Sequence, residues 1–513
     1  MENTENYDNP TNPSTNITTE QTPLLPHLSS SPINHEQRHV PHPPPSHNNT
    51  TILNLICGVL FLAASATGLI NVPLTKLVED AVCRQYYGQP DIEEQLCKLE
   101  TIQSDVAFIF ARMGVCEAVV ALFTALPWGI AADRIGRKLM FSLALLGMAL
   151  GVLFMMMVLW WEDVFPTAFV ALGPVFYVIG GGNAVSMGIL LSIVSNIIPD
   201  DQRAVAFMRL QVSGLVGSLI SPALSSAMMA ITGPWPVMPV AVACLVVGAI
   251  AFLFVTETVQ HKDEDGEETG LDSSHMGFKD HTLRTLSQLK ESLSILSSPS
   301  LFLLILTCLA TTPFATGVLQ FLVQFVSKRY SVPIKNTGYI QMAYGLLQII
   351  QALIIFPWIS NLLLNPTIAP TSTPTLIHIP NEPKRDLILA KYSFYSILIG
   401  FLILGFAPSI AVFMLGLAIL AIGSCYNSLV RSLMSLYVDE KYLSRLFSVV
   451  GMVEIIGSLF GAPMMAGLFT LGMRLGGGWI GLPYYGLAGL CGVCIGILWF
   501  VRLPERRESA EER

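Results

Sequence analysis

The chain has 513 residues, of which 52% are hydrophobic and only 12% are charged, and its mean hydropathy is +0.59. A soluble protein of this length is not this apolar, so the composition predicts a protein that crosses a membrane many times. The net charge of −8 gives no support to nucleic-acid binding, and the absence of a G-x-x-x-x-G-K-S/T loop from the sequence argues against a nucleotide-driven machine.

Residues 1–50 are rich in Pro, Ser, Thr, Asn and His and have no periodic apolar face, so we expect a disordered cytosolic tail. Within it, Glu20–Leu25 fits the acidic dileucine pattern E-x-x-x-L-L, an address that sorting adaptors read for the vacuole or lysosome. Because a pattern with three fixed positions also arises by chance, the vacuolar membrane and the plasma membrane both stay open as locations.

Twelve apolar runs long enough to span a bilayer follow. Their expected bounds are 52–75, 104–130, 139–161, 166–197, 205–232, 236–256, 300–327, 336–364, 387–406, 409–437, 444–472 and 481–502. They divide into an N-terminal six-helix half (51–257) and a C-terminal six-helix half (300–502). Between the halves, residues 258–299 are expected to form a cytosolic linker with an amphipathic helix, and residues 503–513 a second cytosolic tail.

The distribution of Lys and Arg predicts the orientation of these spans. If both termini are cytosolic, twenty of the 28 basic residues lie on cytosolic segments or adjoining helix ends, seven lie opposite, and Arg112 lies within a helix. Cys83 and Cys97 then flank a polar loop on the non-cytosolic side, where disulfides persist. We therefore favour a bridge over two free thiols, although spacing alone does not establish the bond.

An internal repeat relates the two halves. Ala66-Thr67-Gly68 in the first span recurs as Ala315-Thr316-Gly317 in the seventh, and Gly217–Pro222 in the fifth recurs as Gly457–Pro463 in the eleventh. The matches keep the same order along both halves, as a duplication would require. The sequence therefore predicts two parallel six-helix repeats, an architecture known among secondary transporters.

The turn between the second and third spans, residues 129–138, reads G-I-A-A-D-R-I-G-R-K. Three cations beside a membrane would orient two helices unaided, but the whole pattern resembles the G-x-L-x-D-R-x-G-R-K loop of the major facilitator superfamily. The matching residues are Gly129, Asp133, Arg134, Gly136, Arg137 and Lys138, with Ala131 where Leu is commoner. The resemblance implies an all-α membrane protein with twelve transmembrane helices in two six-helix pseudo-repeats.

The same resemblance implies that this loop helps to close a cytosolic gate. Asp133 would cap a helix N-terminus, Gly136 would permit the turn, and Arg134 and Arg137 would reach carboxylates or lipid phosphates. Together with Arg112, Glu117 and the Ser327–Tyr330 segment, the motif looks most similar to fungal members distantly related to the proton-coupled folate transporter group. The substrates of that group do not carry over to this chain.

Charges inside spanning helices are costly unless paired or hydrated, and they mark functional candidates. The four candidates are Arg112 and Glu117 in the second span, Arg431 in the tenth and Glu454 in the eleventh. Arg431 and Glu454 lie at similar depth and are expected to form an ion pair, which is either a structural strut or part of a substrate or proton site. Glu117 is a candidate proton carrier; its alternative role is a protonated carboxyl hydrogen-bonded to a neighbouring backbone.

Uncharged polar residues at membrane depth are candidates for a polar path. They include Asn71 in the first span, Gln320 and Gln324 in the seventh, and Asn427 in the tenth. Gln320 and Gln324 share a helix face through their spacing of four. Each amide has the alternative role of bonding one helix to another, which is the commoner one for a single amide in a bundle.

These observations predict a secondary active transporter that moves a small organic solute by alternating access, coupled to protons. The alternative is a non-transporting membrane sensor that keeps the transporter fold. An enzyme is not expected, because no metal-ligand pair or nucleophile constellation occurs in the spans, and no cofactor or metal is implied. The expected partners are the solute, protons, the bilayer and a sorting adaptor at Glu20–Leu25.

Overall fold

The computed structural model describes residues 47–90, 92–198, 200–255, 298–356, 358–359, 382–438 and 443–503. The predicted sorting signal at Glu20–Leu25, the linker helix and the C-terminal tail beyond residue 503 lie outside the described residues. Every element in the described part of the chain is helical.

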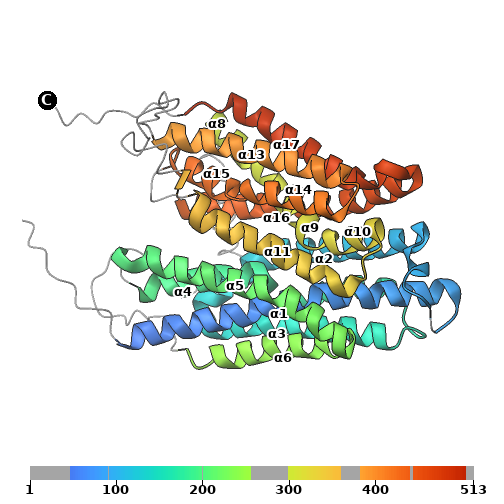
Figure 1. Cartoon of the computed structure of the whole chain (residues 1–513). Coiled ribbons are helices and arrows are strands. Elements are labelled where there is room, and N and C mark those ends of the chain that lie inside the picture. The colour runs from blue at the N-terminus through green and yellow to red at the C-terminus, as the bar shows by residue number, and fades with distance from the viewer. Residues whose placement is uncertain are drawn as a thin grey trace, which may run out of the picture. The chain divides into compact units, whose positions relative to one another are not determined.

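The N-terminal half contains six membrane-crossing segments (Figure 1). They are α1 (His47–Tyr87), α2 (Glu100–Ile135), α3 (Arg137–Trp160), the 3-10 helix η2 (Thr167–Val178) with α4 (Gly182–Ile197), α5 (Asp200–Thr232) and α6 (Val237–Phe252). A short 3-10 helix, η1 (Leu96–Lys98), lies between α1 and α2. Helix α1 packs against both α5 and α6.

The C-terminal half contains six more, several of them interrupted. They are α8 (Pro299–Thr307) with η4 (Cys308–Ala310), α9 (Thr311–Leu319) and α10 (Phe321–Tyr330); α11 (Thr337–Ile350) with the π-helical η6 (Gln351–Ile355); α13 (Glu382–Phe406); α14 (Ile410–Ile422) with α15 (Tyr426–Ser435); α16 (Leu443–Leu475); and α17 (Leu482–Phe500). Two 3-10 turns, η5 (Ile334–Asn336) and η9 (Gly477–Gly481), precede α11 and α17.

The predicted fold class is confirmed. Ten of the described helical segments are long and apolar enough to cross a membrane. The shorter apolar helices η2, α4 and α6 supply the fourth and sixth crossings, which completes twelve. The fourth crossing is divided because Gly180, Gly181 and Gly182 all have positive φ angles, a conformation that glycine adopts at little cost.

Each half has its own hydrophobic core, and α2 connects the two. Most buried residues of α1 to α6 form one cluster, whereas Ala107 and Ala111 of α2 belong to the cluster of the C-terminal half. A Cβ atom added at Gly114 would lie 3.2 Å from the Cβ of Ala462 in α16. Small residues therefore let α2 and α16 approach closely along the seam between the halves.

Helix α1 is longer than predicted. The sequence indicated an end near residue 75, whereas the helix continues to Tyr87. The reason is a continued apolar face: Leu77 and Val78 are buried, as are Ala81 and Val82 one turn later. Lys76 and Glu79, which fell in the predicted loop, thus lie on a packed helix.

The two ends of the bundle are named here by their sequence features. The disulfide end carries the turns at residues 88–99, 161–166, 331–336, 407–409 and 476–481. Residues at the ends of α1 and α10 donate hydrogen bonds to three of these turns: Arg84 to Glu162, Tyr330 to Ala407 and Arg329 to Gly477. The motif end carries residues 129–138, where α2 ends at Gly136 with φ of 121° and α3 begins.

Candidate functional site

A buried polar chain crosses from one half to the other near the disulfide end. Glu79 of α1 is fully buried, and its carboxylate accepts hydrogen bonds from Lys98 Nζ at 2.6 Å and from Gln103 Nε2 at 3.0 Å. The backbone carbonyl of Gln103 in turn accepts from Gln324 Nε2 of α10 at 2.6 Å. The buried Glu79 carboxylate is therefore both ion-paired and hydrogen-bonded, which offsets the cost of removing it from water. This series of hydrogen bonds ends in the C-terminal half.

Further contacts between the halves surround this chain. Ile334 N donates to Glu94 Oε1 at 3.0 Å, and Lys328 Nζ donates to the carbonyl of Lys98. Ser104 and Thr470 share a hydrogen bond of 2.7 Å, Gly338 N donates to Ser226 Oγ at 3.1 Å, and Arg474 lies 3.4 Å from Glu100. We call this set, with the buried polar chain, the polar seal.

A disulfide joins Cys83 at the end of α1 to Cys97 in η1. The bridge closes the loop that presents Glu94 and Lys98 to the C-terminal half. The carbonyl of Cys97 also accepts from Gln103 Nε2 at 3.0 Å. The covalent link thus holds the N-terminal side of the polar seal in place.

Glu94, in the same loop, is a carboxylate on which burial and nearby positive groups act in opposite directions. Burial favours its neutral form, but the Ile334 N–H and the ammonium groups of Lys76 and Lys98 outweigh this effect and lower the pKa of Glu94 below its ordinary value of 4.5. The Lys76 and Lys98 nitrogens lie 3.4 and 3.5 Å from its carboxylate. Glu94 is therefore held as an anion at neutral pH.

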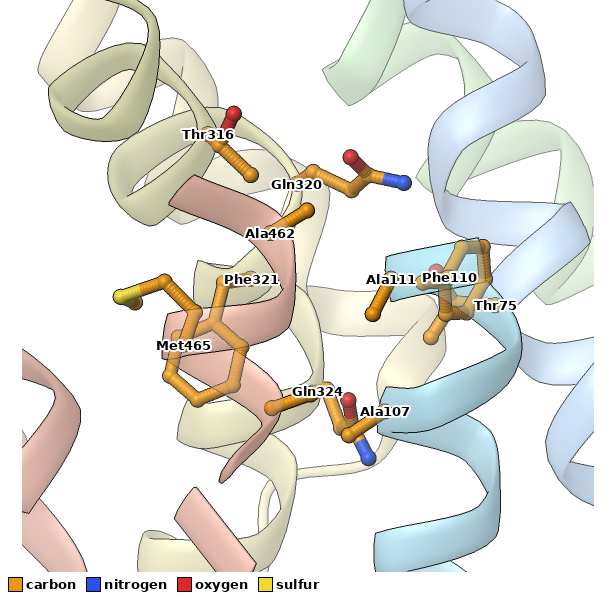
Figure 2. A pocket seen from close by; sticks show the side chains of 11 residues that line it. Thr75, Ala107, Phe110, Ala111, Thr316, Gln320, Phe321, Gln324, Ala462 and Met465 are labelled. Atoms are coloured by element: carbon orange, nitrogen blue, oxygen red, sulfur yellow. The ribbon is translucent and has the colours of Figure 1, made fainter. Parts of the chain in front are cut away.

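A small cavity lies between the halves beside the polar seal (Figure 2). Figure 2 shows Gln320 and Gln324 pointing into it from the C-terminal half, opposite Thr75 and Phe110. It offers about 20 Å³ to the centre of a water molecule, room for roughly one water. The two glutamines share this space, as their spacing predicted, but an organic solute does not fit there in this state.

The seventh span breaks beside this cavity. Helix α9 ends at Leu319 and α10 begins at Phe321, which frees the Leu319 carbonyl from the helical ladder. Asn71 Nδ2 of α1 donates to this carbonyl at 2.7 Å, and Gln341 Nε2 of α11 donates to it as well. Asn71 thus bonds one half to the other at a discontinuous helix, the kind of place where transporters bind solutes.

Arg431 of α15 and Glu454 of α16 form an ion pair with an N–O distance of 2.8 Å. The Glu454 backbone carbonyl also accepts from Thr312 Oγ1 of α9 at 2.9 Å. One turn before Arg431, the Asn427 Oδ1 atom is buried without a hydrogen-bond partner in the described part of the chain, and so is Arg431 Nε. One is an acceptor and the other a donor at i and i+4 on one helix, so a single water or solute group can satisfy both.

The other two intramembrane charges do not join this pair. Glu117 is exposed, although it lies deep among protein atoms and within electrostatic range of Tyr177 in η2. Arg112 lines a crevice, so the two residues occupy different faces of α2, as their spacing of five indicated.

The motif end is described in part. Gly136 makes the turn between α2 and α3, and Arg137 donates to the Ser192 carbonyl of α4 at 3.4 Å. Gly129 is exposed, and Lys138 is half-buried. The side chains of Asp133 and Arg134 lie outside the described part of the chain, so the proposed helix cap by Asp133 stays a prediction.

Sequence patterns did not reveal the polar and charged members of the polar seal on its N-terminal side. Glu79, Glu94, Lys98 and Gln103 were not candidates, because the first span was expected to end near residue 75. The apolar positions Leu77, Val78, Ala81 and Val82 were the signal that the helix continues.

A family model described as Major Facilitator Superfamily matches residues 56–376, which is more than half of the chain. The chain belongs to the Major Facilitator Superfamily. The match begins in α1 and covers the 129–138 motif, so the family suggested by the motif is confirmed.

Members of the superfamily from fungi resemble this chain over most of its length. The MFS efflux pump atnC of Emericella nidulans is 29% identical over 502 residues, covering 92% of this chain and 94% of that protein. The MFS-type transporter aprT of Aspergillus flavus is 25% identical over 476 residues, 90% of each chain. A D-xylose-proton symporter structure shares the fold alone, with a TM-score of 0.61, 11% identity and coverage of 89% of this chain and 98% of that one.

Proposed function

We propose that this protein is a secondary active transporter, not an enzyme, that moves a small organic solute by alternating access and couples this movement to protons. The polar seal is the observation that carries the proposal. It joins both halves of a superfamily member at one end of the bundle, through the Gln324–Gln103 hydrogen bond and its neighbours. A carrier that alternates must close one end while the other admits solute.

Access from the motif end is supported by charged groups inside the bundle. Glu117 is exposed in the N-terminal half, and the Arg431 side chain is 43% exposed in the C-terminal half. Charged side chains at membrane depth stay accessible when they line a water-filled cavity. The solute would therefore meet Glu117, Asn427 and the Arg431–Glu454 pair before it reached the polar seal.

Proton coupling rests on the same residues. Glu117 has no cationic partner within the described residues, so proton binding changes its net charge directly. Glu454 is the second candidate, because a proton on its carboxylate would release Arg431. The likeness to fungal members distantly related to the proton-coupled folate transporter group is consistent with coupling, as a proposal only.

The names of the fungal relatives favour a transporter over a non-transporting sensor. The two fungal proteins bear the names efflux pump and transporter, so we propose export as the direction to test first. We also propose that both termini are cytosolic and that the disulfide end faces the other side. Glycan at the sequons Asn16, Asn48 or Asn49, detected by deglycosylation, would contradict this orientation.

Residence in the vacuolar membrane is a further proposal, which rests on Glu20–Leu25. Replacing Leu24 and Leu25 by alanine is expected to move the protein to the cell surface in fluorescence microscopy. An unchanged distribution would remove the sorting signal and leave the transport proposal untouched.

The decisive experiment is a solute screen on vesicles that contain the purified protein. An imposed pH gradient should drive accumulation of at least one organic solute, and an ionophore that collapses the gradient should abolish it. Protein-free vesicles are the control. Specific binding with no flux under any gradient would favour the sensor.

A further inference from the structure

A second opening lies on the opposite side of the α2–α16 seam from the small cavity of Figure 2. Ala111 of α2 lines both spaces, but this one contains no residue of α1, α9 or α10. Its volume is 350 Å³, within the range of small-molecule sites. Besides Ala111, its lining comprises Phe108, Arg112, Val115, Cys116, Val119 and Pro463. We call it the lateral crevice.

The lateral crevice faces the bilayer. Large apolar side chains beside it on both helices are exposed: Val119 is 39% exposed, Phe123 73% and Phe460 69%. In a transmembrane helix, a contiguous exposed apolar surface is the surface that lipid covers. A molecule dissolved in the bilayer reaches this site without entering the path between the halves.

Arg112 is the only charged residue of the crevice lining. It is exposed, and it makes no ion pair or side-chain hydrogen bond with any residue that the structure describes. It lies about 12 Å along α2 from residue 104, where the apolar part of this helix begins, and α2 continues from there to Ile135. A guanidinium remains charged at this depth, so it needs an anion or a water defect to offset its desolvation.

We infer that the lateral crevice binds the anion of a hydrophobic monocarboxylic acid from the bilayer. The guanidinium fork of Arg112 matches a carboxylate bidentately, and the low dielectric strengthens that pair. The apolar body of the acid lies along Phe108, Val115 and Val119, and Pro463 closes the far wall. A phospholipid fits less well, because Arg112 lies about 12 Å inside the apolar run that begins at residue 104, whereas a phosphate stays at the edge of the hydrocarbon core.

The test is binding of dodecanoate to the full-length protein in phosphatidylcholine nanodiscs. Arg112→Gln is expected to weaken binding at least tenfold, and Arg112→Lys is expected to give an intermediate loss, because an ammonium lacks the bidentate geometry. Arg209→Gln removes an exposed arginine of α5 that belongs neither to the polar seal nor to the crevice, and it is the matched control; it should leave binding unchanged. Dodecanol, which has no carboxylate, should bind weakly to all four proteins.

A second measurement keeps the test independent of how the arginine variants fold. Cys116 lines the same crevice and is a free thiol, so dodecanoate should slow its alkylation by a membrane-permeant maleimide several-fold, as followed on its own peptide by mass spectrometry. Val119→Trp, which fills the crevice and keeps Arg112, should abolish both binding and protection.

Equal dodecanoate affinity of the wild type and Arg112→Gln would overturn the inference. So would a phospholipid that co-purifies with the wild type but not with Arg112→Gln, because it would assign the crevice to a phosphate. None of these results depends on flux, so the transport proposal stands or falls separately.

Discussion

Gln324 of the C-terminal half donates its side-chain amide to the backbone carbonyl of Gln103 in the N-terminal half at 2.6 Å. Both side chains are buried, and the Gln103 amide is itself committed to Glu79 and to the carbonyl of Cys97. One hydrogen bond between the halves is therefore backed by a fixed N-terminal network. The closed state at the disulfide end depends on this arrangement.

Replacing Gln324 by leucine should destabilise the closed disulfide end. The variant removes both hydrogen bonds that Gln324 donates to Gln103 and leaves the buried Gln103 Oε1 without its donor. This costs about 1–3 kcal/mol, or roughly a five- to 150-fold shift in the open-to-closed ratio. Distance measurements between labels at the exposed positions Tyr86 and Trp479 should show a larger open population. Gln320→Leu, on the same helix face but outside the polar seal, serves for comparison; equal effects from both would contradict a specific role for Gln324.

Glu94 predicts how stability depends on acid. Its pKa is lower in the folded state than in the unfolded chain, so its ion pairs contribute stability above the ordinary value of 4.5. That contribution, on the order of 1 kcal/mol, is lost as the pH falls through the lowered folded-state pKa. Melting temperatures measured from pH 7.5 to pH 3.5 should therefore show an acid step that Glu94→Gln lacks.

Glu93→Gln is the matched control for this step. Glu93 is the exposed neighbour in the same loop, and its side chain has no described ion pair. Its replacement should keep the acid dependence of the wild type. If the melting temperatures of Glu94→Gln and the wild type change in parallel at every pH, the charge of Glu94 contributes no stability to the folded state.

The disulfide is expected to stabilise both the fold and the polar seal. A bridge with a sequence separation of 14 contributes about 3 kcal/mol through the entropy of the unfolded chain. Peptide mapping without reduction should recover Cys83 and Cys97 linked, and reduction should lower the melting temperature. Cys425→Ser, which changes a free thiol, should leave the response to reductant intact; two free thiols at 83 and 97 would refute the bridge.

The Arg431–Glu454 pair is a structural strut or part of a solute or proton site, and a double-mutant cycle separates these roles. If the pair is a strut, Arg431→Gln and Glu454→Gln each lower the melting temperature, and the double variant recovers part of it. If it belongs to the site, both single variants stop flux, stability changes little, and the double variant does not recover transport. The unpartnered Asn427 and Arg431 atoms favour the second outcome.

Periodicity and charge sufficed for the twelve crossings, because an apolar run of spanning length has few alternatives in a bilayer. They also sufficed to place Arg431 beside Glu454, since both lie at similar depth on adjacent spans. They failed where a span changes character: the Gly180–Gly182 break and the Leu319–Gln320 break leave the hydropathy unchanged. The extension of α1 past residue 75 was missed because its charges are satisfied by partners distant in sequence, such as Lys98 for Glu79.

The polar seal also needed three-dimensional information for another reason. Its acceptors on the N-terminal side include the backbone carbonyls of Lys98 and Gln103, and its donors include the backbone N–H groups of Ile334 and Gly338. Backbone groups carry no sequence signature. Of its members, only the side chain of Gln324 was visible as a candidate, without its partner.

Replacing Glu117 tests whether proton coupling can be separated from solute transport itself. Glu117→Gln keeps the size of the side chain and cannot exchange a proton, so it should abolish accumulation driven by a pH gradient. It should still allow exchange of labelled for unlabelled solute across the vesicle membrane, because exchange needs no net proton movement. One coupled proton supplies about 1.4 kcal/mol per pH unit, so a gradient of two units should concentrate the solute roughly a hundredfold in the wild type and not in the variant.

The control for this prediction is Glu454→Gln, which removes the other candidate carboxyl while leaving Glu117 in place. Loss of exchange as well as accumulation in Glu117→Gln would mean that the residue is needed for the movement of the halves or for solute binding, and its proximity to Tyr177 would then be structural. Accumulation that persists in Glu117→Gln but disappears in Glu454→Gln would move the proton site to the Arg431–Glu454 pair. In that case protonation would act by breaking an ion pair in the C-terminal half, and solute binding should weaken as Arg431 loses its partner.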